Sequence, residues 1–147
     1  MSKNLNETIG AVEYDGLIVD NVPVADVFTV TIRKEASAAV TLKRGTVLAL
    51  SSAGSDPGKM VILGTEAADA VTGEGGAITT PAEVLTADCV LCDDTVVGTS
   101  ADVEALAYRT GHFARNKLIV AAEYTMTAAD EQDLRKAGIL LDDAINC

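Results

Sequence analysis

The sequence AYRTGHFARNKLIV, residues 107–120, decides the fold together with TAADEQDLRKAGILL, residues 127–141. In the first stretch we expect a strand over residues 101–110 and a glycine turn at residues 111–112. A second strand, over residues 117–121, should follow that turn. The second stretch predicts a short helix that ends at a glycine and delivers a last apolar segment. Strands that precede one late helix are typical of a mainly β (α+β) protein.

The helix has a signal at each end and should cover residues 128–137. Thr127 is a natural N-cap, and Asp130 stands where a capping-box partner is needed. Gly138 fits the left-handed position that ends many helices. Glu131 and Arg135 are spaced to form an ion pair along one helix face.

The first hundred residues contain short apolar runs separated by turn residues. The best strand is VFTVTIR, residues 27–33, in which Phe28, Val30 and Ile32 alternate with more polar residues. The glycine-rich stretch at residues 72–81 has the spacing of neither a P-loop nor a dinucleotide motif, so we expect a loop that joins strands. Further strands are expected within residues 39–50, which turn at Gly45, and over residues 59–64 and 84–92.

The composition predicts one domain with an aliphatic core. The chain has 147 residues, an ordinary length for a single domain. Aromatic residues make up only 3% of it and tryptophan is absent, so valine, isoleucine, leucine and alanine must fill the core. Such side chains suit packed strands better than long helices.

The chain before this domain looks like an arm. We divide the sequence into an extended N-terminal arm, residues 1–26, and a single β-rich domain, residues 27–147. Residues 1–10 are polar and are expected to be loose. Pro23 restricts the apolar part of the arm to an edge strand or an extended segment. That part either adds a strand to the sheet of another protein or folds as an edge strand on its own domain. Its candidate contact residues are Leu17, Ile18, Val19, Val22 and Val24.

The charge excludes several partners. The formal net charge is −11, whereas nucleic-acid-binding proteins cluster lysine and arginine against phosphates, so we expect no direct contact with DNA. No apolar run approaches the roughly 18–20 residues that cross a bilayer, so no membrane partner is expected. The first residues have no secretory signal pattern, which predicts synthesis in the cytoplasm.

The sequence offers no convincing catalytic, cofactor or metal site. Cys89 and Cys92 form a C-x-x-C pair, but we expect them on a strand, where residues three apart point to opposite faces. A zinc site would need two more ligands, and only His112 and Cys147 remain as nitrogen or sulfur donors. We interpret at least one cysteine as a buried apolar residue and His112 as a loop residue with local hydrogen bonds. The Asp93-Asp94 pair is interpreted as a turn.

The closing block of the chain resembles the lambda-type bacteriophage head decoration proteins. The resemblance is densest over residues 103–141, in YRTGHFARNKLIV and LRKAGILL, and is weaker over the first hundred residues. It implies a bent β-ribbon, or β-clip, that forms an incomplete barrel, with homotrimers at three-fold positions on the outer surface of the expanded head. The implied partner is the major capsid protein, gripped in part by the N-terminal arm. The residues of the matching turn that could be structural or form subunit contacts are Arg109, Gly111, Phe113 and Asn116.

Two other classes of function compete with this interpretation. One is a β-rich interaction or adhesion module of a virion that binds a host surface or a tail component. A sugar-binding surface would need exposed aromatic side chains, which the composition hardly provides. The other class is an enzyme, for which the sequence shows no convergent set of polar residues. The acidic charge suits an outer shell surface but also suits any soluble protein.

Overall fold

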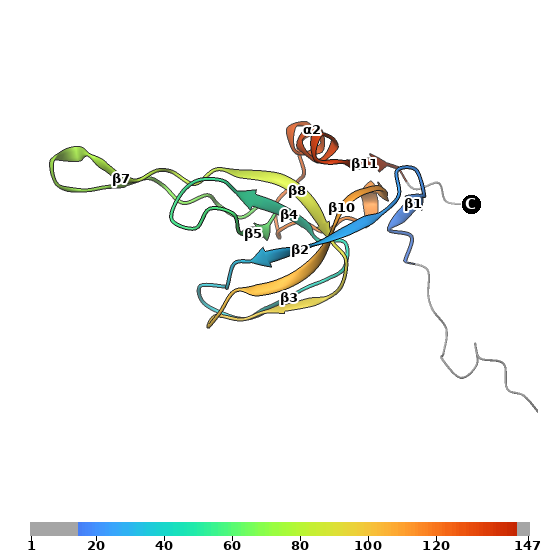
Figure 1. The fold of residues 1–147 in the computed structure, drawn as a ribbon, viewed down its shortest axis with the longest axis horizontal. Coiled ribbons are helices and arrows are strands. Elements are labelled where there is room, and N and C mark those ends of the chain that lie inside the picture. The colour runs from blue at the N-terminus through green and yellow to red at the C-terminus, as the bar shows by residue number, and fades with distance from the viewer. Residues whose placement is uncertain (1–14, 144–147) are drawn as a thin grey trace, which may run out of the picture.

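The computed structural model describes residues 15–143, and the prediction of a mainly β protein with one short C-terminal helix is confirmed. The loose stretch expected at residues 1–10 and the terminal Cys147 lie outside the described residues. Small strands surround a barrel in the middle of the molecule, and a narrow ribbon projects from one end (Figure 1).

Five strands form the barrel. Following the hydrogen bonds around it, β10 (Val103–Ala114) pairs with β2 (Asp26–Ile32), β2 with β5 (Met60–Ile62), β5 with β4 (Val47–Ser51), and β4 with β8 (Leu85–Leu91). A pairing between β8 and β10 then closes the ring. The barrel is therefore closed, where the family resemblance implied an incomplete one.

Two of the strand pairings in this ring are short. β2 and β5 run parallel and share a single register pair, Ile32 with Met60, supported by a 2.9 Å hydrogen bond from the Arg33 amide to the Met60 carbonyl. β8 and β10 share two register pairs, which involve Ala107 and Tyr108 of β10. The barrel is thus held mainly by its longer antiparallel pairs.

Strand β10 does not turn at Gly111 and His112, so that prediction was wrong. The strand continues to Ala114 and changes partners instead. Its first part pairs with β2, whereas its last four residues lie between antiparallel β1 (Ile18–Asp20) and parallel β11 (Ile139–Asp142). Gly111 has a φ of 151°, which a side-chain-bearing residue rarely adopts, and this lets the strand leave the barrel without ending.

The strand expected over residues 117–121 is also absent from the described structure. Residues Arg115–Lys117 form a 3₁₀ turn, η2, and Ile119 makes one isolated parallel bridge with Thr46. The Val47 amide donates to the Ile119 carbonyl at 2.8 Å, and the Ile119 amide donates to the Gly45 carbonyl at 3.0 Å. This segment makes an isolated bridge and packs on the domain instead of forming a strand.

The helix, α2, spans Ala128–Ala137 as predicted. The Thr127 hydroxyl accepts from the Asp130 amide at 3.2 Å, and the Asp130 carboxylate accepts from the Thr127 amide at 2.9 Å. Gly138 adopts the left-handed conformation, with a φ of 114°. The expected pair between Glu131 and Arg135 was wrong, because Glu131 instead binds Arg115 of the 3₁₀ turn at 2.6 Å.

The helix cap gives a first prediction. Replacing Thr127 by alanine should lower the free energy of unfolding by about 1 kcal/mol, because the Asp130 amide loses its acceptor. We expect the midpoint of thermal unfolding to fall by about 2–6 °C for a domain of this size. Thr125→Ala, an exposed threonine outside the helix, is the matched control. Equal melting of the two variants would contradict the role of the cap.

The buried side chains form two cores that share a wall. The barrel core takes one or more side chains from every strand of the ring, whereas the second core lies between the outer wall of the barrel and the layer made by β1, β11 and α2. Leu48 and Cys89 point into the barrel core, while their neighbours Val47 and Val90 belong to the second core. β4 is therefore buried on both faces over most of its length, and β8 over residues 89–91, which explains the apolar sequences there.

Two small pairs of strands lie outside the ring. β3 (Val40–Leu42) pairs with β9 (Thr95–Val97) and covers one end of the barrel with Leu42 and Val97. The glycine-rich stretch expected as a loop is a two-stranded ribbon instead, made by β6 (Val71–Thr72), the 3₁₀ turn η1 (Glu74–Gly76) and β7 (Ile78–Thr80). The β-branched residues on either side of the glycines were the signal for it.

Candidate interaction surface

The apolar part of the predicted arm is fixed to the domain at its beginning. Arg44 binds the Asp15 carboxylate at 2.7 Å, and the Ala114 amide donates to the Leu17 carbonyl at 2.8 Å. The Leu17 side chain is only 2% exposed, and Ile18 pairs in register with Phe113. The alternative that this part folds as an edge strand on its own domain is therefore confirmed for residues 17–20.

The same segment is fixed again where it enters β2. The Thr110 hydroxyl donates to the Val24 carbonyl at 2.7 Å and accepts from the Asp26 amide at 3.3 Å. Arg109 donates to the Asp26 carboxylate through Nε at 3.1 Å and Nη2 at 2.8 Å. Asp26 and Arg109 are both more than half exposed, so this pair orients the chain more than it stabilises it.

Between these two attachments the chain presents aliphatic side chains to solvent. Val22 is 74% exposed and Val24 is 71% exposed, although valine is usually buried. Val19 is exposed to a smaller degree. We call residues 19–24 the valine segment. Leu17 contributes to the core and is not available to a partner in this conformation, whereas Val22 and Val24 are.

The four residues of the family-like turn have different environments. Phe113 is fully buried, with its ring centroid 5.2 Å from that of Tyr108. Gly111 lies under this ring: a Cβ built on it would come within 2.6 Å of Phe113. Arg109 and Asn116 are exposed. Phe113 and Gly111 thus form part of the domain's interior, while Arg109 is adjacent to the valine segment through its contact with Asp26.

Arg44 is a residue that sequence reasoning missed. Its guanidinium binds Asp15, donates to the Cys92 carbonyl at 3.0 Å and to the Tyr108 hydroxyl at 2.5 Å, and lies over the Tyr108 ring. Its own amide donates to Asp94 at 2.8 Å. Burial works against the charged form, but the hydrogen bonds to Tyr108 and Asp15 outweigh it and raise the pKa of Arg44. This arginine joins the chain ahead of the valine segment, at Asp15, to β10 and to the turn after β8.

The two cysteines face different cores, Cys89 from within β8 and Cys92 from the residue that follows it. Cys89 is fully buried in the barrel core and Cys92 packs at the edge of the second core, so at least one has the expected apolar role. Burial, with a smaller contribution from the charge of Asp88, raises the pKa of the Cys89 thiol and disfavours the reactive thiolate.

His112 does not lie in a loop, contrary to the prediction. It is part of β10, and its Nε2 atom lies 3.5 Å from an oxygen of Asp142 on β11. Its Nδ1 atom is buried and has no hydrogen-bond partner within residues 15–143. His112 therefore lies between β1 and β11 and approaches Asp142, instead of forming the local hydrogen bonds expected of a loop residue.

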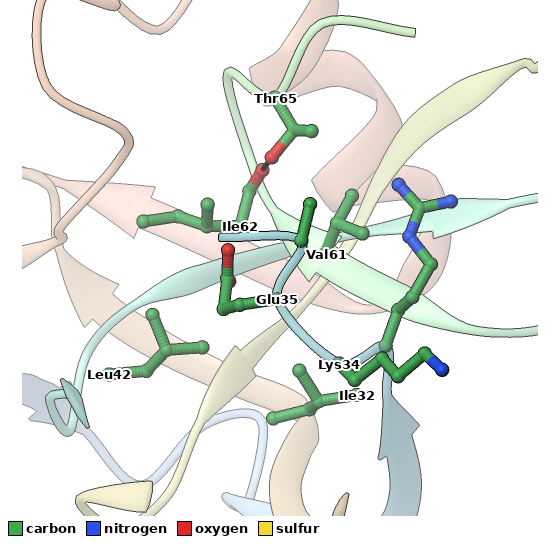
Figure 2. Close-up of a pocket in the computed structure, with 9 residues that line it drawn as sticks. Ile32, Lys34, Glu35, Leu42, Val61, Ile62 and Thr65 are labelled. Carbon is green, nitrogen blue, oxygen red and sulfur yellow. Dashed lines mark hydrogen bonds between the residues drawn. The ribbon is translucent and has the colours of Figure 1, made fainter. Parts of the chain in front are cut away.

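A small hollow opens where β2 and β5 meet. Its volume is about 200 Å³, and its walls include the aliphatic side chains of Ile32, Leu42 and Ile62 (Figure 2). Glu35 and Thr65 also line it. Arg33 and Lys34 add cationic groups to this lining. The hollow is therefore lined by both aliphatic and charged side chains.

Two further features concern the described residues. Within residues 15–143, no group of three or more His, Cys, Asp and Glu side chains is placed to hold a metal ion. The single α-helix of the same region is too short and too polar to span a membrane.

The chain matches no protein-family model, and no curated protein matches it.

Proposed function

We propose that this protein is a capsid decoration protein, which binds the outer surface of an expanded phage head and stabilises it against the pressure of packaged DNA. The observation that carries the proposal is the valine segment, an aliphatic stretch fixed at both ends and presented to solvent. The partner in this proposal is the major capsid protein, and the bound form is a homotrimer at three-fold positions.

Two further features support the proposal. The closing block, with strand, capped helix and Gly138 followed by a last apolar strand, has the order found in lambda-type decoration proteins. We also propose that the barrel with its side sheet is a variant of the β-clip of that family. The net charge of −11 is compatible with an outer surface that never meets the genome.

The stabilising mechanism follows from linkage. A protein that binds only the expanded lattice adds its binding free energy to that state and shifts the equilibrium toward it. Val22 and Val24 can supply part of this energy, since covering a valine side chain contributes about 1.5 kcal/mol. Three copies in one trimer multiply weak individual contacts through their effective concentration.

Co-sedimentation with capsids tests the function. We expect saturable pelleting of the protein with expanded shells of the matching phage and no pelleting with compact proheads. The double variant Val22→Ser, Val24→Ser should bind at least about tenfold more weakly, since each serine removes roughly a kilocalorie or more of apolar burial. Its thermal midpoint should stay close to that of the unmodified protein, because both side chains are exposed.

The matched control is Val40→Ser, Val96→Ser, which changes two exposed valines on β3 and β9. Absence of pelleting by the unmodified protein with either shell would rule out the capsid role. Equal affinity of the two double variants would leave the capsid role intact and remove the valine segment from it.

A further inference from the structure

The ribbon that joins β5 to β8 is an exposed element that no other part of residues 15–143 covers. It projects from the barrel at one end of the longest axis of the molecule (Figure 1). All of residues 66–79 are exposed, including Val71 and Ile78, and the Ile78 residue is 66% exposed. Two-stranded ribbons are at best marginally stable in water, because they have no face to bury. An ordered ribbon with exposed aliphatic side chains is therefore suited to completion by a partner.

The root of the ribbon is fixed to the barrel by a buried carboxylate. The Glu83 side chain is only 3% exposed and binds Arg33 at 2.5 Å. It also accepts hydrogen bonds from the Ser51 hydroxyl at 2.8 Å and from the Ala68 amide at 3.0 Å. The Glu83 amide donates to the Ala68 carbonyl at 2.8 Å, so the two chains of the ribbon are tied together where they leave the barrel. The ribbon is held in a defined direction.

The charge of the ribbon indicates the chemistry of its partner. Between Lys59 and Arg109 the sequence has nine Asp and Glu residues and no Lys or Arg. Three of these acids, Glu66, Asp69 and Glu74, lie on the ribbon and form no ion pair within residues 15–143. The described ion pairs elsewhere occupy Arg33, Lys43, Arg44, Lys59, Arg109, Arg115 and Lys136. A surface that complements the ribbon is therefore expected to be cationic.

We propose that the ribbon is a second capsid contact, which binds a cationic patch of the shell protein through its carboxylates and packs Ile78 and Val71 on the same patch. This inference rests on the proposed function. The valine segment has related chemistry, since the exposed Asp20 lies among its exposed valines. Figure 1 shows β1, next to the valine segment, well away from the ribbon, so one copy touches the shell at two separated points. Two separated contacts add their binding free energies and fix the orientation of the copy on the lattice.

The test uses the full-length protein and purified expanded shells. The ribbon variant Glu66→Gln, Asp69→Asn, Glu74→Gln removes the three carboxylates without shortening a side chain. We expect it to bind about tenfold more weakly, because three exposed ion pairs of ordinary strength are lost. Its affinity should also depend less on salt than that of the unmodified protein, since exposed charges are screened. Ile78→Thr should weaken binding in the same direction.

Matched controls distinguish an effect of the ribbon on binding from effects of net charge and of misfolding. Asp93→Asn, Glu104→Gln, Glu123→Gln neutralises three exposed acids away from the ribbon, so both triple variants have a formal net charge of −8, from −11 plus three. Val96→Thr is the control for Ile78→Thr. We expect both controls to bind like the unmodified protein and all variants to unfold at similar temperatures.

The outcomes also separate the two proposals. Failure of the unmodified protein to bind expanded shells overturns the proposed function and this inference with it. Binding of the unmodified protein together with unchanged affinity of the ribbon variant, or an equal loss in the acid control, overturns the ribbon contact alone. Combined with the Val22→Ser, Val24→Ser change, the ribbon variant should show the product of the two fold-losses, because the contacts are separate.

Discussion

Replacing Phe113 by alanine is expected to lower the free energy of unfolding by about 3–5 kcal/mol, the largest loss we expect from a single substitution. The Phe113 ring is fully buried in the second core and touches the Tyr108 ring. Its removal leaves a cavity that the neighbouring strands cannot fill, because Gly111 beneath it has no side chain to offer. Urea unfolding followed by circular dichroism measures the change.

The other phenylalanine provides the control. Phe28 is partly exposed at the edge of the barrel core, so Phe28→Ala should cost less than Phe113→Ala. Phe113 also lies against Ile18 in β1, so its loss should loosen the attachment of the valine segment and weaken shell binding as well. A Phe113→Ala protein as stable as the Phe28→Ala protein would show that the second core does not depend on this ring.

Replacing Glu83 by glutamine is expected to lower the free energy of unfolding by about 2–4 kcal/mol at neutral pH, because Arg33 loses its charged partner in a mostly buried site. Burial alone would raise the pKa of Glu83. Hydrogen bonds from the Ala68 amide, Arg33 and Ser51 outweigh burial and hold this pKa below its ordinary value of 4.5. The folded state therefore favours the ionised form of the carboxyl group.

The sign of the pH dependence follows from this lowered pKa. The stabilisation is fully present above pH 4.5 and is lost as the pH falls through the lower pKa of the folded state. The difference in unfolding free energy between the unmodified protein and Glu83→Gln should thus shrink below pH 4.5. Urea titrations at neutral and acidic pH measure it, with the exposed Glu104→Gln as control. A difference that stays constant with pH would contradict the stabilising role of the ionised Glu83 carboxylate.

Local signals predicted the parts of the fold that depend on neighbours in sequence. Thr127, Asp130 and Gly138 determine the helix ends through backbone hydrogen bonds and a left-handed φ, and each of these lies within a few residues of its partner. The alternation of Phe28, Val30 and Ile32 predicted the inward face of β2 for the same reason.

Tertiary contacts decided the rest. Gly111 reads as a turn in sequence, but β1 and β11 supply partners on both sides of the strand that follows it, so β10 continues. The sequence could not show that Leu17 is buried while Val22 and Val24 are exposed, because the burial of Leu17 depends on β10 and on the second core. Arg44 gave no signal, since its partners Asp15, Cys92 and Tyr108 lie far away in sequence.

The wall that the two cores share has a consequence for how the domain comes apart. β4 and the last three residues of β8 are buried on both faces, so the loss of either core would expose an aliphatic surface of the other core to water. A half-folded intermediate that keeps only the barrel, or only the layer around α2, is therefore costly. The barrel and the layer that carries the valine segment behave as one cooperative unit, and strain applied to that segment is resisted by the whole domain.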